Sequence, residues 1–125
     1  RVVTPKRPYL LNAIHAWLLD NNETPYISVD ADGDIGAIPE SAVKDGVVVL
    51  NVSPTAIESL DIGLDAMSFY CRFNGVRTSI NLPMRSILAI YGKESGQGIE
   101  FDKLEYPENP KSVANEKPKT ELRLV

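Results

Sequence analysis

Very few residues of this chain are of types that carry out covalent chemistry. His15 is the only histidine and Cys71 the only cysteine, so they could form one thiol–imidazole pair. No Asn or Asp can be identified as the group that would orient the imidazole, and we interpret His15 as a helix-surface residue. The Asp and Glu residues are scattered among expected turns, so a pair of carboxylates for acid–base catalysis cannot be assigned. The sequence therefore predicts a protein that is not an enzyme, with no catalytic residues and no cofactor.

Two segments imitate ligand-binding loops. The stretch from Asp30 to Asp34 opens like a calcium loop, but Ile35 stands where glycine is needed and Ser41 where a bidentate glutamate is needed. The stretch from Gly92 to Gly98 is rich in glycine and carries a lysine, yet it lacks a GKS or GKT sequence and a following helix. We interpret the first as a turn between strands and the second as a flexible loop, and we expect no metal site.

Length and cysteine content describe a small intracellular domain. A chain of 125 residues is large enough to bury one core. The single cysteine excludes an internal disulfide, which fits a reducing cytosol. The apolar run from Tyr9 to Leu19 is too short to span a bilayer and lacks a cleavage-type site after it. We expect a cytoplasmic protein that does not bind membranes.

The charge distribution bears on the kind of partner. Residues 1 to 101 contain eight Lys and Arg against twelve Asp and Glu, a net charge of −4, whereas residues 102 to 125 contain five of each. A nucleic-acid backbone would need a clustered patch of the opposite sign. The charge pattern therefore disfavours binding to nucleic acid.

Only one segment has a clear helical pattern. Pro8 suits a first turn, and the polar residues from Asp20 to Asn22 favour leaving the helix. Between them, apolar residues recur over an arc of roughly 160° at about 100° per residue. We expect this arc to face the core, and its members are Leu10, Leu11, Ala13, Ile14, Trp17 and Leu18.

A second apolar patch lies on the far side of this helix, where a monomer would expose it to water. It predicts a homodimer whose interface contains Tyr9, Asn12, Ala16 and Leu19. The alternative is that the helix is sandwiched between the body of the domain and the carboxy-terminal tail.

After Thr24 and Pro25 the pattern changes to alternating residues and short β-branched runs. Asn74-Gly75 is the strongest hairpin signal. The predicted fold is mostly β with one N-terminal helix (α+β), as a small twisted barrel or sandwich. The predicted strands are Tyr26 to Asp30, Ile35 to Ile38, Val47 to Asn51, Leu60 to Gly63, Met67 to Phe73, Val76 to Leu82 and Ile87 to Tyr91.

Several motifs carry a family resemblance. In order they are Arg7-Pro8-Tyr9-Leu10-Leu11, Trp17-Leu18-Leu19-Asp20-Asn21, Thr24-Pro25-Tyr26, Lys44-Asp45-Gly46, Val49-Leu50-Asn51, Arg72-Phe73 and Ile87-Leu88-Ala89-Ile90-Tyr91-Gly92-Lys93-Glu94. Their order and spacing resemble stringent starvation protein B (SspB), a family of bacterial adaptors that deliver tagged proteins to the ClpXP protease. The resemblance runs from about Thr4 to Phe101 and resumes at the last four residues. It implies an Sm-like, SH3-like barrel packed on the helix within residues 1–103, in the bacterial cytoplasm.

A barrel whose strands do not all close leaves an edge or groove for an extended peptide. Phe69 and Phe73 are expected in the core, with Arg72 between them facing the other way. The resemblance implies that the segments around Asn51 and Tyr70 line a groove for the ssrA tag, which is added to stalled nascent chains. The family usually has Asn and then Ala where this chain has Tyr70 and Cys71. Carried over by position, the peptide-binding residues are Asn51, Ser53, Ala56, Tyr70, Cys71 and Arg72.

The last part of the chain, residues 104–125, differs from the body. The segment from Pro107 to Thr120 is polar and interrupted by proline, which predicts a flexible linker. The end is apolar and basic, and a ragged terminus or an added edge strand are the alternatives to a docking motif. The resemblance implies docking on the amino-terminal zinc-binding domain of the ClpX unfoldase, although family linkers are commonly long and acidic. The docking residues are Leu122, Arg123, Leu124 and Val125.

Two functions from different classes fit the sequence. The first is a non-enzymatic adaptor that binds the ssrA degradation tag and delivers tagged substrate proteins to ClpXP. The second is an Sm-like RNA-binding module with an incidental tail. The acidic body and the lack of a Lys and Arg cluster with interleaved aromatic residues favour the adaptor.

Overall fold

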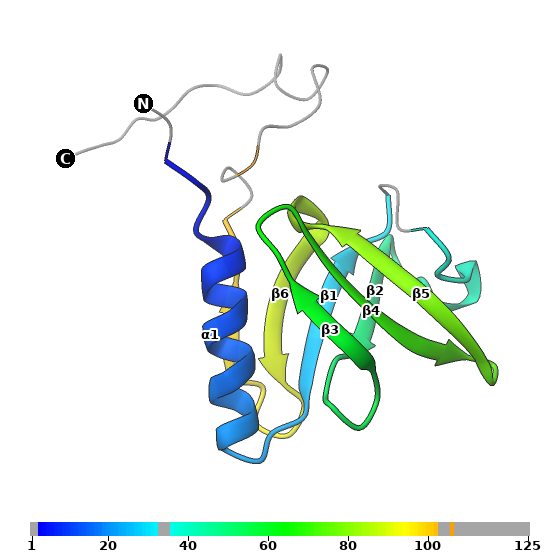
Figure 1. Cartoon of the computed structure of the whole chain (residues 1–125), viewed down its shortest axis with the longest axis horizontal. Coiled ribbons are helices and arrows are strands. Elements are labelled where there is room, and N and C mark those ends of the chain that lie inside the picture. The colour runs from blue at the N-terminus through cyan, green and yellow to red at the C-terminus, as the bar shows by residue number, and fades with distance from the viewer. Residues whose placement is uncertain (1–2, 33–35, 103–105, 107–125) are drawn as a thin grey trace.

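The structure, a computed structural model, describes residues 3–32, 36–102 and 106. This part of the chain forms one α-helix, seven strands and two short 3-10 helices (Figure 1). The elements are α1 (Arg7–Asp20), β1 (Pro25–Asp30), η1 (Glu40–Ala42), β2 (Val47–Asn51), β3 (Glu58–Ile62), β4 (Ala66–Phe73), β5 (Val76–Pro83), η2 (Met84–Ser86), β6 (Ile87–Gly92) and β7 (Gly98–Glu100).

The strands form two antiparallel sheets, one with the order β2-β1-β6-β7 and the other with the order β3-β4-β5. Alternation places one face of each sheet inward: Ile27 and Val29 of β1 are buried, as are Met67 and Phe69 of β4. The buried residues of both sheets form one continuous core. The predicted fold class, mostly β with an N-terminal helix, is confirmed.

Most of the predicted strands are present within one or two residues of their expected ends. The hairpin at Asn74-Gly75 joins β4 to β5, with φ angles of 53° and 81°. These positive values are those of a tight two-residue turn, which Asn and Gly adopt most readily. The predicted strand from Ile35 to Ile38 is wrong, because the described residues from Gly36 onward form a turn and an irregular segment before η1. A short β-branched run was too weak a signal there.

Residues 93–97 of the predicted loop connect β6 to the unpredicted strand β7, while Gly92 ends β6 and Gly98 begins β7. Gly98 begins β7 opposite Tyr91, where a side chain would collide with the neighbouring backbone. The loop is also tied to the start of β1, because both Thr24 N and Thr24 Oγ1 donate to the Glu94 carboxylate, each at 2.7 Å. These hydrogen bonds, that of the Thr24 hydroxyl first, lower the pKa of the Glu94 carboxyl.

Helix α1 packs on β6, β1 and β3, so it contacts both sheets (Figure 1). Leu11 and Leu18 are fully buried, but the inward face is rotated from the predicted arc. Trp17 is 43% exposed and Ala13 is also exposed, so the expectation that both face the core was wrong. The reason is that polar side chains occupy part of the inward face: Arg7 is buried, and the half-buried His15 has Nε2 2.9 Å from the Val52 carbonyl oxygen.

The helix ends where the sequence indicated. Asn22 adopts a positive φ of 59°, and Glu23 N donates to the carbonyl oxygen of Leu18. Asparagine tolerates this left-handed conformation better than most residues. Among the residues that the structure describes, none forms a helix with the length and apolar character that a membrane span requires.

Arg7 joins the start of α1 to segments far along the chain. Its side chain is only 2% exposed. Nη1 donates to the carbonyl oxygens of Ile87 at 2.8 Å, Arg85 at 3.2 Å and Met84 at 3.4 Å, and Nη2 donates to that of Asp102 at 2.7 Å. The guanidinium also lies over the rings of Phe101 and Tyr106, 5.1 and 4.7 Å from their centroids. One buried cation therefore holds the helix, η2, β6 and the end of the body together.

We predict that Arg7→Met lowers the free energy of unfolding by about 3 kcal/mol, because it keeps the apolar stem but removes donors from buried carbonyl groups. Urea unfolding followed by circular dichroism measures the change. Arg85→Met is the matched control, since that side chain is exposed, and it should change stability by less than about 0.5 kcal/mol. Equal effects of the two variants would contradict the role assigned to Arg7.

Candidate peptide-binding groove

Strand β4 has an open edge at its carboxy-terminal end. It pairs with β5 along its whole length, but β3 pairs with it only as far as Glu58 opposite Tyr70. Within the described residues, the three positions from Cys71 to Phe73 therefore have a strand partner on the β5 side alone. An exposed edge of this kind can accept an extended chain as an additional strand.

The connection between β2 and β3 turns away from this edge. Asn51 Oδ1 accepts a hydrogen bond from Ser53 N at 2.9 Å, and Ser53 O accepts from Ala56 N and Ile57 N at 2.9 and 3.2 Å. The Ser53 and Thr55 hydroxyls lie 3.1 Å apart. A side-chain turn of this type is typical of Asn before a bend. The bend places residues 54–57 across from the end of β4 and leaves a space between them.

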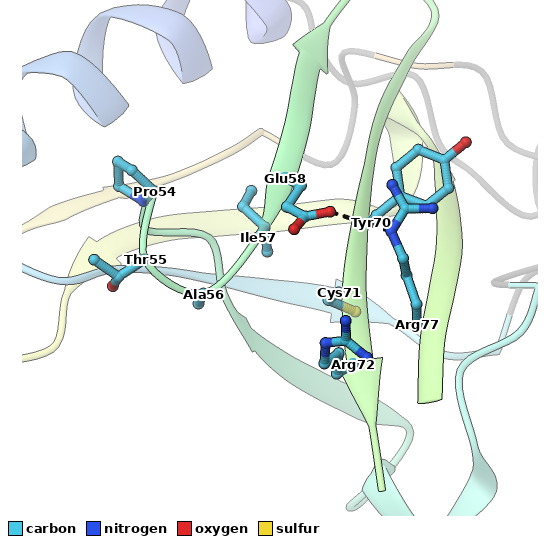
Figure 2. A pocket seen from close by; sticks show the side chains of 9 residues that line it. All are labelled: Pro54, Thr55, Ala56, Ile57, Glu58, Tyr70, Cys71, Arg72 and Arg77. Atoms are coloured by element: carbon cyan, nitrogen blue, oxygen red, sulfur yellow. Dashed lines mark hydrogen bonds and ion pairs between the residues drawn. The ribbon is translucent and has the colours of Figure 1, made fainter. Parts of the chain in front are cut away.

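This space, with a volume of about 290 Å³, is the groove. Figure 2 shows the residues of the bend on one side and those of β4 and β5 on the other. Both a small side chain and charged side chains reach it, so it offers apolar contact beside polar contacts. Its lining residues are Pro54, Thr55, Ala56, Ile57, Glu58, Tyr70, Cys71, Arg72 and Arg77.

The structure brings four of the six predicted peptide-binding residues together in the groove: Ala56, Tyr70, Cys71 and Arg72. The other two, Asn51 and Ser53, are not among its lining residues. Ser53 is buried, and both residues hold the bend through the hydrogen bonds described above. In the structure they position the groove wall and do not line it.

Sequence reasoning missed five lining residues, which are Pro54, Thr55 and Ile57 of the bend, Glu58 of β3 and Arg77 of β5. Arg77 lies directly opposite Arg72 in the β4–β5 register. That pairing can be counted back from the Asn74-Gly75 turn, because each step away from a hairpin moves one residue along both strands. Glu58 lies opposite Tyr70 on the other neighbour of β4, and the start of β3 carries no comparable turn signal.

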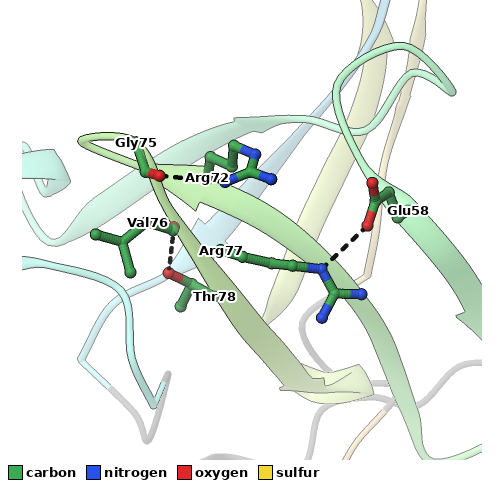
Figure 3. A network of polar contacts seen from close by, with 6 residues as sticks. All are labelled: Glu58, Arg72, Gly75, Val76, Arg77 and Thr78. Carbon is green, nitrogen blue, oxygen red and sulfur yellow. Dashed lines mark hydrogen bonds and ion pairs between the residues drawn. The ribbon is translucent and has the colours of Figure 1, made fainter.

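A polar cluster forms the outer wall of the groove. Arg77 Nε donates to Glu58 Oε1 at 3.1 Å, and its guanidinium carbon lies 3.9 Å from the centre of the Tyr70 ring. Arg72 Nη1 donates to the carbonyl oxygen of Gly75 at 3.1 Å (Figure 3). The two arginines of the groove therefore point to different partners, although their backbones face each other.

Cys71 lies on the inner side of the groove and is not disposed for nucleophilic chemistry. Its thiol is free, and partial burial raises its pKa. A catalytic cysteine needs the opposite shift, because the thiolate is the reactive form. Over the described residues, no group of three or more His, Cys, Asp or Glu side chains is placed to hold a metal ion. The arrangement supports binding.

The fold and the groove define a small, mostly β domain with one N-terminal helix and an open strand edge. The chain belongs to the SspB family: the family model described as stringent starvation protein B matches residues 5–123. The chain is also 43% identical over 118 residues to a stringent starvation protein B homolog of Haemophilus influenzae. The aligned region covers 94% of this chain and 76% of that protein. Membership in this family supports an adaptor-type role in broad terms.

Proposed function

We propose that this protein is a non-enzymatic adaptor that binds the ssrA degradation tag in the groove and delivers tagged proteins to the ClpXP protease. The observation that carries the proposal is the open edge of β4, beside which the bend after β2 leaves a groove. Ala56, Tyr70, Cys71 and Arg72, which were assigned to tag binding from the resemblance, line this groove. A backbone edge provides affinity, and the adjoining pocket provides selectivity for particular side chains.

Delivery would use the end of the chain as a tether. The proposed docking motif, Leu122 to Val125, lies outside the described residues, so this step rests on the sequence. A tag held in the groove and a tail held on ClpX would make engagement of the substrate intramolecular. The effective concentration for a short flexible linker is of order millimolar. The adaptor would thus lower the substrate concentration needed for degradation, while the protease supplies the energy of unfolding.

We also propose that the adaptor is a homodimer formed through α1. Tyr9 and Trp17 are 57% and 43% exposed, and Ala13 and Ala16 lie exposed on the same side of the helix. Asn12 is exposed as well, whereas Leu19 of the predicted interface is half-buried. Two large aromatic residues beside two alanines give an apolar stripe that a second helix can approach closely. Two protomers would present two grooves and two tails.

We predict that Arg72→Gln and Ala56→Val each weaken binding of a fluorescein-labelled ssrA peptide by about tenfold, by removal of a charged donor and by added bulk in the groove. Fluorescence anisotropy measures the affinity, and thermal melting should be unchanged. Val49→Ala is the control, since Val49 is exposed on β2 and does not line the groove. Wild-type affinity in both groove variants would place the peptide site elsewhere.

Deletion of Leu122 to Val125 should abolish adaptor-stimulated degradation of a tagged substrate by ClpXP and leave tag binding unchanged, because the two sites are proposed to be separate. Degradation assays with purified components measure the effect. Replacement of Lys117 and Lys119 by Gln, which leaves the terminal motif intact, is the control. A truncated protein that delivers substrate at the normal rate would contradict docking through the tail.

Ala16→Glu should convert the dimer to a monomer at a protein concentration of roughly tens of micromolar, because it places a charge in an apolar contact. Sedimentation equilibrium measures the mass. Val49→Glu introduces the same charge at another exposed apolar position and should leave the dimer intact. The proposed helix interface would be wrong if the wild type sediments as a monomer or if Ala16→Glu remains dimeric.

A further inference from the structure

Two arginines face each other at the groove in a chain of net negative charge. Arg72 and Arg77 occupy directly opposite positions on β4 and β5. Like charges at directly opposite positions destabilise a sheet. Such a pair is tolerated when each charge finds a partner elsewhere, and it concentrates positive potential at that point.

The partner of Arg77 is held weakly. Glu58 accepts its Nε hydrogen bond at 3.1 Å, but the two side chains are 51% and 64% exposed, the larger value being that of Glu58. An exposed ion pair contributes little stability because solvent competes for both charges. The guanidinium carbon of Arg77 lies 3.9 Å from the centre of the Tyr70 ring. This contact fixes the position of the cation and does not involve Glu58. Arg77 can therefore exchange one carboxylate for another without leaving the groove.

Both arginines retain donors for a further acceptor. In the described part of the chain, Arg77 uses only Nε and Arg72 uses only Nη1 in hydrogen bonds to protein. The terminal nitrogens of Arg77 point away from Glu58 (Figure 3). Both residues line the groove together with Glu58. A carboxylate entering there would receive charge-assisted hydrogen bonds, which are stronger than those between neutral groups.

We propose that Arg77, stacked on Tyr70, binds an acidic side chain of the bound peptide. Glu58 is the internal competitor, which holds Arg77 while the groove is empty. This inference rests on the proposed function, because it requires a peptide in the groove. The peptide backbone would pair with the open edge of β4, and its carboxylate would replace Glu58 on Arg77. Arg77 then determines the specificity for acidic peptides, and competition from Glu58 lowers the affinity with which they bind.

The test compares two fluorescein-labelled ssrA peptides of equal length and identical termini. One is the tag itself, and in the other any Asp or Glu side chain of the tag is replaced by the corresponding amide. Affinities for both are measured by anisotropy for the wild type, Arg77→Gln, Glu58→Gln and Arg85→Gln. The last variant removes an exposed arginine that does not line the groove, and it controls for net charge. Thermal melting of each variant verifies folding.

We expect Arg77→Gln to weaken binding of the acidic peptide about five- to tenfold and that of the amide peptide less than about twofold, as for loss of a charge-assisted contact. Glu58→Gln should strengthen binding of the acidic peptide roughly two- to fivefold, the scale of an exposed ion pair. The preference of the wild type for the acidic peptide should fall as salt is raised. Arg85→Gln should behave as the wild type.

The inference is overturned if Arg77→Gln weakens both peptides equally, because Arg77 would then only support the wall. It is also overturned if Glu58→Gln leaves binding of the acidic peptide unchanged or weaker. In either case wild-type binding of the tag leaves the proposed function standing. If the wild type binds neither peptide, the proposed function fails and this inference fails with it.

Discussion

The buried guanidinium of Arg7 is the contact on which the arrangement of α1 depends. It lies at the beginning of the helix and donates to carbonyl groups of η2, β6 and Asp102. Few side chains can satisfy several carbonyl oxygens at once, and the planar, multiply donating guanidinium is the one suited to it. Because the helix contacts β6, β1 and β3, fixing its start also fixes how it covers the two sheets. The outward stripe of Tyr9 and Trp17 follows from that orientation.

The groove exists because β3 is too short to pair with the whole edge of β4. β3 begins at Glu58, and its pairing with β4 is interrupted by a register shift near Ser59, whose φ of 55° is unusual for a strand. The hydrogen bonds of Asn51 and Ser53 turn the segment before β3 away from the edge of β4. The end of β4 thus keeps an unshared edge while its inner face stays packed through Phe69. An open edge and core packing therefore occur in the same strand on different sides.

The charges at the groove contribute little to stability. Glu58 and Arg77 are both exposed, so their ion pair adds little to the free energy of unfolding. The guanidinium of Arg77 also stacks on the ring of Tyr70. Tyr70 thus belongs to a polar cluster that also includes Glu58 and Arg77. In the function proposed above, the selectivity of the groove for a peptide would depend on this combination of side chains.

Local patterns in the sequence determined the helix, most strands and the Asn74-Gly75 hairpin, because turn chemistry and alternation act over a few residues. The family resemblance, and not a local pattern, indicated both segments that border the groove. The buried face of α1 was misjudged, since an apolar count cannot foresee that Arg7 and His15 turn inward toward distant carbonyl groups. Strand β7 and the wall residues Glu58 and Arg77 depend on pairing between strands. Only the tertiary structure decides such contacts, because their partners are remote in sequence and are selected by packing.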